Sequence, residues 1–299
     1  MRVLVIGGTR FIGPYVVKEF REHGHEVTVF HRGQHCSSLL PQVRHFRSDR
    51  AAIPVMHFPP DLLNEEFDVV IHMIPMGEAD ARAAVQAFTG RVLRLVVLSS
   101  GDVYQAYGRF VGIEPGEPEA GLLTEDSALR TVLYPYRSKS KSTDDLNYSY
   151  DKILVEQQAL GQTQLPVSVL RLPKVYGPGG NADLATIHGY QDRTEWRWTH
   201  GYVENIAAAV VLAAIHPHAA QRVYNIGEPY TPTISERLRS LPPSTLPIAD
   251  ATGLDFRNDI VYDTTRIRTE LGYCEPVSYE EGIRRTLLWE RTNAVSSLS

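Results

Sequence analysis

The sequence predicts an α/β fold: a Rossmann-type, doubly wound parallel sheet with a small, discontinuous C-terminal lobe. The first observation is an apolar strand, residues 2–6, that runs into a glycine-rich turn and enters a helix at Ile12. The second is a repeated alternation of strand and helix patterns, which is typical of parallel sheets with right-handed crossovers. The third is size: 299 residues, 43% hydrophobic and 22% charged, can form a core domain with a smaller lobe.

Apolar periodicity gives the elements in order. Strands are predicted over residues 2–6, 26–30, 43–47, 67–74, 92–100, 167–172 and 222–226. Helices are predicted over residues 12–23, 78–88, 143–161, 202–215, 264–272 and 278–291. Gly24 ends the first helix, as glycine does just past a helix C-terminus, and Ser278 with Glu281 resembles a capping box at the start of the last. Residues 108–137 are rich in proline and glycine and predict a long surface excursion.

Composition and charge argue against several classes of function. The net charge of -5 and the pI of about 6.1 do not call for a nucleic-acid partner, which usually binds a basic face. The longest apolar run, residues 206–215, is about half of what a bilayer needs, and the N-terminal apolar stretch is no signal peptide. Cys36 and Cys274 lie far apart without metal-ligand spacing. We therefore expect a cytoplasmic protein with reduced thiols, without metal, membrane or nucleic-acid partners.

The turn after the first strand predicts a nucleotide cofactor. Gly7, Gly8 and Gly13 allow the backbone to turn tightly into the helix, and this geometry places a pyrophosphate over the free N–H groups of a helix N-terminus. We expect cofactor contacts from Gly7, Thr9, Arg10, Phe11, Ile12 and Gly13. Residues 1–175 with 202–226 would form the dinucleotide-binding domain. Residues 176–201 with 227–299 would form a substrate-binding lobe over the carboxyl ends of the strands.

Two further residues carry the predicted chemistry. Tyr148 and Lys152 are four apart in a helical pattern, so that their side chains would share one face. A free tyrosine has a pKa of about 10, and a neighbouring lysine cation favours the phenolate and lowers that pKa. Ser100, at the end of an apolar strand, could hold the substrate oxygen. Such a pair is common by chance, but this one follows a glycine turn and a strand that ends in serine.

These segments resemble the extended short-chain dehydrogenase/reductase family, the NAD-dependent epimerase/dehydratase group. The similar segments are GGTRFIG, LSSGDVY (98–104), YSYDK (148–152), LRLPKVYGPGG (170–180), YVENIAAAV, YNIG and DTTRIRTELGY. The resemblance covers nearly the whole chain and implies that Tyr148 is the general acid or base. It implies that Lys152 binds the nicotinamide ribose and tunes Tyr148, and that Ser100 orients the reacting oxygen. Tyr150 is expected to pack or to contact the substrate rather than to catalyse.

The resemblance also implies further cofactor contacts: Ile74, Pro75, Lys152, Pro173 and Val175, with Asp49 at the adenine or in a plain turn. NAD-preferring members end the second strand in an acid, whereas this chain has His31 and Arg32, and Arg10 replaces the middle glycine of the turn. Because no carboxylate repels a 2′-phosphate there, the sequence favours NADP over NAD. The alternative is that both arginines face solvent and NAD binds without the acid.

The expected substrate contacts are Asp102, Tyr104, Tyr176, Trp196 and Arg197. Only fifteen residues separate Gly180 from Trp196, and Arg197 is one position out of step with the phosphate-binding arginine of nucleotide-sugar enzymes, which makes a nucleotide-sugar pocket doubtful. Trp196 and Trp198 share a face, which predicts either a less polar site or core packing.

The leading hypothesis is hydride transfer between nicotinamide and a hydroxyl or carbonyl carbon of a sugar-like molecule or secondary metabolite, with reduction, oxidation or epimerisation as the outcome. GGTRFIG and HRG also resemble relatives of the chloroplast stem-loop RNA-binding proteins, so a non-catalytic regulator or RNA-binding protein is one alternative. An enzyme that retains its cofactor without net redox is another. Family members often pair two helices per subunit, which predicts a homodimer through the helices near 79–89 and 144–160.

Overall fold

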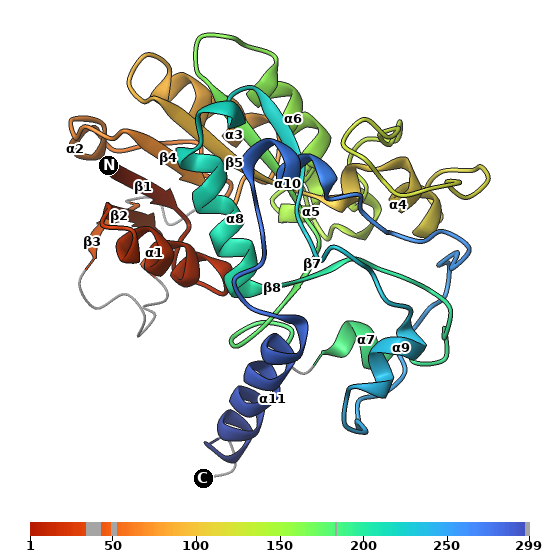
Figure 1. Cartoon of the computed structure of the whole chain (residues 1–299). Coiled ribbons are helices and arrows are strands. Elements are labelled where there is room, and N and C mark those ends of the chain that lie inside the picture. The colour runs from red at the N-terminus through yellow and green to blue at the C-terminus, as the bar shows by residue number, and fades with distance from the viewer. Residues whose placement is uncertain (34–42, 49–52, 183, 297–299) are drawn as a thin grey trace.

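The computed structural model describes residues 1–33, 43–48, 53–182 and 184–296 (Figure 1). Its centre is a seven-stranded sheet in the order β3-β2-β1-β4-β5-β6-β9. Every neighbouring pair is parallel. The strand order reverses between β1 and β4, and open parallel sheets bind ligands at such a switch point. The predicted fold class is confirmed.

The strands follow the predicted apolar runs closely. They are β1 (Arg2–Ile6), β2 (Glu26–His31), β3 (Arg44–Arg47), β4 (Val69–His72), β5 (Arg94–Ser100), β6 (Val167–Leu172) and β9 (Arg222–Asn225). Residues of β1 alternate between two hydrophobic cores: Val3 and Val5 pack on one face, Leu4 and Ile6 on the other. Because both faces are covered, the central strands read as continuous apolar runs.

Helices cover both faces of the sheet (Figure 1). On one face α1 (Ile12–Glu22) packs against α8 (Val203–Ile215), and on the other α3 (Glu78–Phe88) packs against α6 (Lys152–Leu160). The predicted helices over 12–23, 78–88 and 202–215 are confirmed. No helix within the described ranges is both long and apolar enough to span a bilayer.

The remaining elements are short. β7 (Lys174–Tyr176) and β8 (His200–Tyr202) form a separate parallel pair. The other helices are α2 (Pro60–Leu63), α4 (Gln105–Phe110), α5 (Leu146–Ser149), α7 (Ala185–Gly189), α9 (Ile234–Arg239), α10 (Thr265–Leu271) and α11 (Tyr279–Ser296). In Figure 1, α7, α9 and α11 lie together below the sheet and its helices. The division of the chain into two domains stays a prediction.

The predicted helix over 143–161 is wrong in one respect that matters for the site. It is two helices, α5 and α6, separated by Tyr150 and Asp151 in extended conformation. The Asp151 carboxylate accepts a hydrogen bond from the Ile153 N–H at 2.9 Å and so caps the start of α6. Tyr148 and Lys152 therefore do not share the face of one helix.

Candidate active site

The turn between β1 and α1 is built for close approach of the backbone. Gly7 has a φ of 88°, a conformation that side chains rarely adopt. A Cβ at position 13 would lie 2.6 Å from the Cα and carbonyl carbon of Gly8, so the first turn of α1 rests directly on the glycine turn. The Thr9 N–H donates to the Gly7 carbonyl at 3.0 Å. This arrangement leaves the N-terminus of α1 facing the adjacent cavity.

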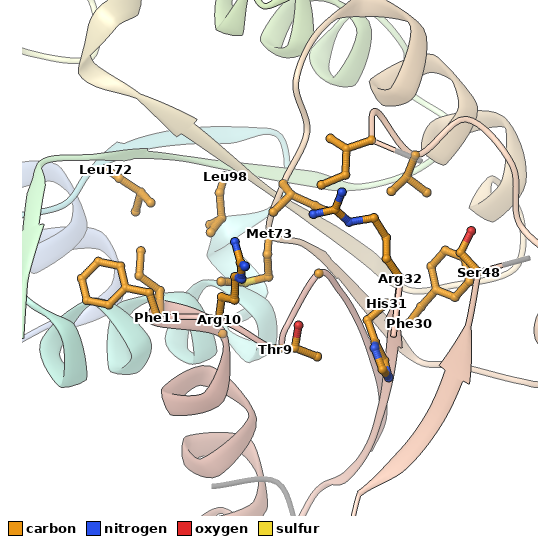
Figure 2. A pocket seen from close by; sticks show the side chains of 16 residues that line it. Thr9, Arg10, Phe11, Phe30, His31, Arg32, Ser48, Met73, Leu98 and Leu172 are labelled. Atoms are coloured by element: carbon orange, nitrogen blue, oxygen red, sulfur yellow. The ribbon is translucent and has the colours of Figure 1, made fainter. Parts of the chain in front are cut away.

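A cavity of about 220 Å³ opens beside this turn, at the switch point of the sheet (Figure 2). The predicted cofactor residues on its wall are Gly7, Thr9, Arg10, Phe11, Ile12, Gly13, His31, Arg32 and Ile74. Apolar side chains complete the wall: Phe30, Val55, Met73, Leu98 and Leu172. The combination of an apolar cleft and a helix N-terminus fits a dinucleotide, with its pyrophosphate over the turn.

The three basic residues at this cavity are arranged differently. In Figure 2, Arg10 and Arg32 extend over the cavity, whereas His31 points away from it. His31 Nδ1 accepts from the Gly33 N–H at 3.0 Å, so that Nε2 carries the proton and donates to His45 Nδ1 at 3.0 Å. Burial, His45 and Arg47 lower the pKa of His31. Of these three basic residues, Arg10 and Arg32 are therefore the two that place a cation at the cavity.

A second cavity of about 410 Å³ adjoins the first and shares Phe11, Ile12, Met73, Leu98 and Leu172 with it. Its wall contains the ends of β5 and β6: Ser99, Ser100, Lys152, Pro173, Lys174, Val175, Gly180 and Asn181. Predicted catalytic residues Ser100 and Lys152 and predicted cofactor residues Pro173 and Val175 thus meet in one space. A dinucleotide that starts at the glycine turn would end here.

Lys152 is a buried cation held by backbone oxygens. Its Nζ donates to the carbonyl oxygens of Pro75 and Leu98, the latter at 3.0 Å. Burial lowers the pKa of Lys152 to about 8, although Asp102, Asp80 and Glu156 act in the opposite direction. Pro75, expected at the cofactor, fixes this ammonium through its carbonyl oxygen.

The two tyrosines of YSYDK face different surroundings. The Tyr148 ring lies under the Arg137 guanidinium, 4.6 Å from its centroid, and the Tyr148 carbonyl accepts from Arg137 Nε at 2.9 Å. Within the described residues no hydrogen bond is made by the Tyr148 hydroxyl. Tyr150 instead donates from its hydroxyl to Asp102 Oδ2 at 2.8 Å, and its ring centroid lies 5.7 Å from Lys152 Nζ.

Asp102 is the centre of a buried polar cluster. It is 4% exposed and accepts from Tyr136 at 3.1 Å as well as from Tyr150. Tyr136 and Tyr107 share a further hydrogen bond of 2.9 Å between their hydroxyls. Burial raises the pKa of Asp102, and hydrogen bonds from both tyrosines and the charges of Arg130 and Lys152 oppose that rise.

Two expected substrate contacts lie elsewhere. Tyr104 is fully buried, and its hydroxyl donates to Asn225 Oδ1 at 2.6 Å and accepts from Arg171 at 3.0 Å, so it is part of the core. Tyr176 lines a different cavity of about 200 Å³, together with Tyr202. The sequence around these two tyrosines did not indicate whether their side chains face the core or a cavity. Asp49 lies outside the described residues.

Trp196 and Arg197 are also engaged within the protein. Trp196 is 3% exposed, and its ring stacks on Phe110 at 5.0 Å and lies 5.5 Å from Trp198. The two tryptophans thus share a face, in an aromatic core cluster. Arg197 forms an ion pair with Asp259 at 2.7 Å.

Sequence reasoning missed Lys174 and Asn181. Lys174 is half-buried on the second cavity, with Nζ 5.6 Å from the Trp198 ring centroid, and burial lowers its pKa. The Asn181 amide nitrogen on the same wall is buried, and no acceptor for it lies in the described part of the chain. The available signal for Lys174 was a cation two residues after the buried strand β6, at the edge where parallel sheets bind ligands. Across the ranges that the structure describes, no cluster of three or more His, Cys, Asp or Glu could hold a metal.

Known proteins resemble this chain in sequence and in fold. Residues 3–81 match the model of the NAD dependent epimerase/dehydratase family. The chain is 26% identical over 326 residues to a dTDP-glucose 4,6-dehydratase of Streptomyces niveus, a match that covers 98% of this chain and 94% of the relative. A UDP-glucose 4-epimerase of Thermus thermophilus, solved with NAD, superposes with a TM-score of 0.68 at 22% identity, covering 97% of this chain and 99% of the epimerase.

A third relative is longer than this chain. It is the trifunctional UDP-glucose 4,6-dehydratase/UDP-4-keto-6-deoxy-D-glucose 3,5-epimerase/UDP-4-keto-L-rhamnose-reductase of Arabidopsis thaliana, 23% identical over 348 residues. The match covers 97% of this chain but 47% of that enzyme, so the chain spans about half its length. The chain therefore resembles the NAD dependent epimerase/dehydratase family, and the family match lies over residues 3–81, the part of the chain that contains the glycine turn.

Proposed function

We propose that this protein binds a nicotinamide dinucleotide and transfers hydride between it and a hydroxyl or carbonyl carbon of a small molecule. The observation that carries the proposal is the pair of adjoining cavities. One begins at the glycine turn, and the other ends at Ser100 and Lys152, so a single extended ligand would connect them. When bound, the dinucleotide would supply or accept the hydride. Whether the net outcome is reduction, oxidation or epimerisation depends on the substrate.

The protein's own groups would bind and orient the dinucleotide. The N-terminus of α1 and the turn at Gly7 favour the pyrophosphate charge, since N–H groups and the helix dipole point toward it. Lys152, held by two carbonyl oxygens, would present its ammonium toward the ribose and the reacting ring. Ser100, on the wall of the second cavity, would donate to the reacting oxygen.

NAD is the cofactor named with the Thermus epimerase, and we propose NAD or NADP for this chain. The preference for NADP rests on Arg10 and Arg32, which extend over the cavity where an acid would otherwise grip the ribose (Figure 2). His31 contributes less, because both of its ring nitrogens are engaged. The ratio of NADP to NAD affinity, measured for the protein and for R32A, tests the preference.

The substrate would be a small polar molecule with an anionic or carbonyl group. Ser100, Lys174 and Asn181 are hydrogen-bond donors on one wall, and such a set suits acceptor oxygens. The relatives are named for UDP- and dTDP-sugars, and a nucleotide sugar is one candidate. Against it, Arg197 is occupied by Asp259. A homodimer through α3 and α6 and a cytoplasmic location stay predictions.

Two measurements test the proposed function. Tryptophan-sensitised NADH fluorescence gives the dissociation constants for NADH and NADPH. Absorbance at 340 nm then follows turnover on nucleotide sugars, other sugars and carbonyl compounds. We expect micromolar binding of at least one dinucleotide and a substrate whose conversion changes the absorbance. A protein that binds neither dinucleotide at millimolar concentration contradicts the proposal.

A further inference from the structure

The segment YSYDK is folded so that its second tyrosine, not its first, contacts Asp102 and lies near Lys152. The helix stops at Ser149 and restarts at Lys152, and the intervening Tyr150 and Asp151 are extended. Asp151 fixes this break: its carboxylate accepts from the Tyr134 N–H at 2.6 Å and pairs with Arg130 at 3.3 Å, where both side chains are fully buried. The break is therefore part of the packed interior rather than a frayed helix end.

Tyr148 contacts Arg137 instead of the charged groups of the site. Its ring is covered by Arg137, and neither Ser100 nor Lys152 is among its described partners.

Tyr150 has the neighbours that the chemistry needs. Its hydroxyl donates to Asp102 Oδ2 at 2.8 Å, and Ser100 acts to lower the pKa of Tyr150. Its ring centroid is 5.7 Å from Lys152 Nζ. Lys152 and Ser100 both line the second cavity, so Tyr150 neighbours a residue of the wall that would face the substrate oxygen.

We propose that Tyr150, rather than Tyr148, is the catalytic acid and base of this protein, with Asp102 and Tyr136 as positioning residues. The inference rests on the proposed hydride transfer. In the reducing direction the substrate carbonyl oxygen replaces Asp102 as acceptor of the phenol's hydrogen bond. The carbonyl carbon would receive hydride from a bound reduced nicotinamide, which would be oxidised. The Tyr150 O–H bond breaks, and its proton passes to the carbonyl oxygen, which becomes a hydroxyl.

The charges around Tyr150 suit proton donation. Burial and the neighbouring Asp102 raise its pKa, while Ser100 acts in the opposite direction, so the phenol is protonated at neutral pH. The phenolate left after donation would lie beside the Lys152 ammonium, which stabilises it. The oxidising direction is the exact reverse and needs the phenolate, which this environment favours less.

The first test needs no substrate. 3-Fluorotyrosine is placed at position 150 in one sample and at position 148 in another, and ¹⁹F NMR spectra are recorded without and with saturating NAD or NADH. We expect the label at 150 to shift on binding and to differ between the two redox forms, because it lies near the reacting ring. The label at 148 should stay within the linewidth. A shift at 148 with none at 150, or at neither position, overturns the proposal.

The second test uses the substrate found by absorbance screening. We expect Y150F to lower kcat at least 100-fold with the NADH dissociation constant unchanged, and Y148F to lower it less than threefold. Y230F, at a tyrosine that is 64% exposed, is the matched control for loss of a phenol. Loss of turnover in Y148F with activity kept in Y150F assigns the role to Tyr148 instead. If the wild-type protein binds no dinucleotide, the proposed function is wrong. The direct binding measurement therefore distinguishes an error in the proposed function from an error in the assignment of Tyr150.

Discussion

Among single residues, Gly13 determines how closely α1 approaches the glycine turn, because it has a hydrogen atom where other residues have a Cβ. A Cβ there would lie 2.6 Å from two backbone atoms of Gly8, which cannot move without opening the turn. We expect G13A to lower NADH affinity at least tenfold and to lower the melting temperature. Fluorescence titration and thermal scanning measure both. G121A is the control, because a Cβ at Gly121 has no neighbour within 4 Å among the described residues; equal affinity in the two variants would contradict the role of the turn.

A second prediction for a single residue concerns Lys174. Its ammonium is half-buried against Trp198, and burial lowers its pKa, so an anionic substrate group would gain a partly desolvated cation. For the substrate identified by screening, K174M should raise KM about tenfold or more and leave the NADH dissociation constant unchanged. Steady-state kinetics measure KM, and the exposed Lys18 provides the control variant K18M. An unchanged KM would remove Lys174 from the substrate site.

At the scale of elements, the break between α5 and α6 shows where sequence reasoning stopped. Tyr148 and Lys152 stand four apart, and apolar periodicity continues across both, so a continuous helix was the natural prediction. The signal for the break was Asp151 directly before the apolar run from Ile153, a pattern typical of an N-cap. The partner that fixes it, Arg130, lies 21 residues away in the chain. Local sequence patterns do not contain such a long-range contact.

The same break gives a stability prediction. D151A would remove the N-cap of α6 and leave the Arg130 guanidinium buried without its carboxylate. We expect a loss of about 3–5 kcal/mol in the free energy of unfolding, the usual consequence of breaking a buried ion pair from one side. Urea unfolding followed by circular dichroism measures it. Asp145 caps the exposed α5, and D145A should cost clearly less; similar losses in the two variants would contradict a structural role of the buried pair.

Strand β4 gives a prediction on pH. His72 is fully buried, neither ring nitrogen has a partner within the described ranges, and burial, with Lys152 nearby, lowers its pKa to about 3. Below pH 6.5 the unfolded chain binds a proton at His72 that the folded chain does not, so stability falls as pH falls from 6.5 toward 3. At pH 5 this amounts to about 2 kcal/mol.

H72L removes the titrating group at similar volume. The loss of stability between pH 7.5 and pH 5, measured by urea unfolding, should be smaller in H72L than in the wild type by about the same 2 kcal/mol. Identical pH profiles would mean that His72 is protonated in the folded protein or finds a partner there.

At the scale of the whole molecule, the sheet could be predicted and the lobe could not. Alternating strands and helices leave few topologies for a parallel sheet, and the glycine turn marks its first strand. The residues between Gly7 and Gly13 that line the first cavity were predicted from that turn, and their contact with a cofactor stays a prediction. The expected substrate contacts Tyr104 and Tyr176 depend instead on how short elements outside the sheet pack, and their aromatic side chains suit a core as well as a cavity. The positions of these two side chains therefore could not be predicted from the sequence.

Ligand binding by the whole chain should change its thermal stability. A ligand that binds only the folded state stabilises it by RT ln(1 + [L]/Kd), about 2.7 kcal/mol at 100 times the dissociation constant. For a protein of this size that raises the melting temperature by roughly 4 °C. We expect NADH to produce this shift in the wild type and a much smaller one in G13A at the same concentration. A structured RNA should give no shift at 50 or 200 mM salt, because a chain with a net charge of -5 offers little to phosphates. An RNA-induced shift that falls steeply with salt, without any effect of NADH, would favour the RNA-binding alternative over the enzyme.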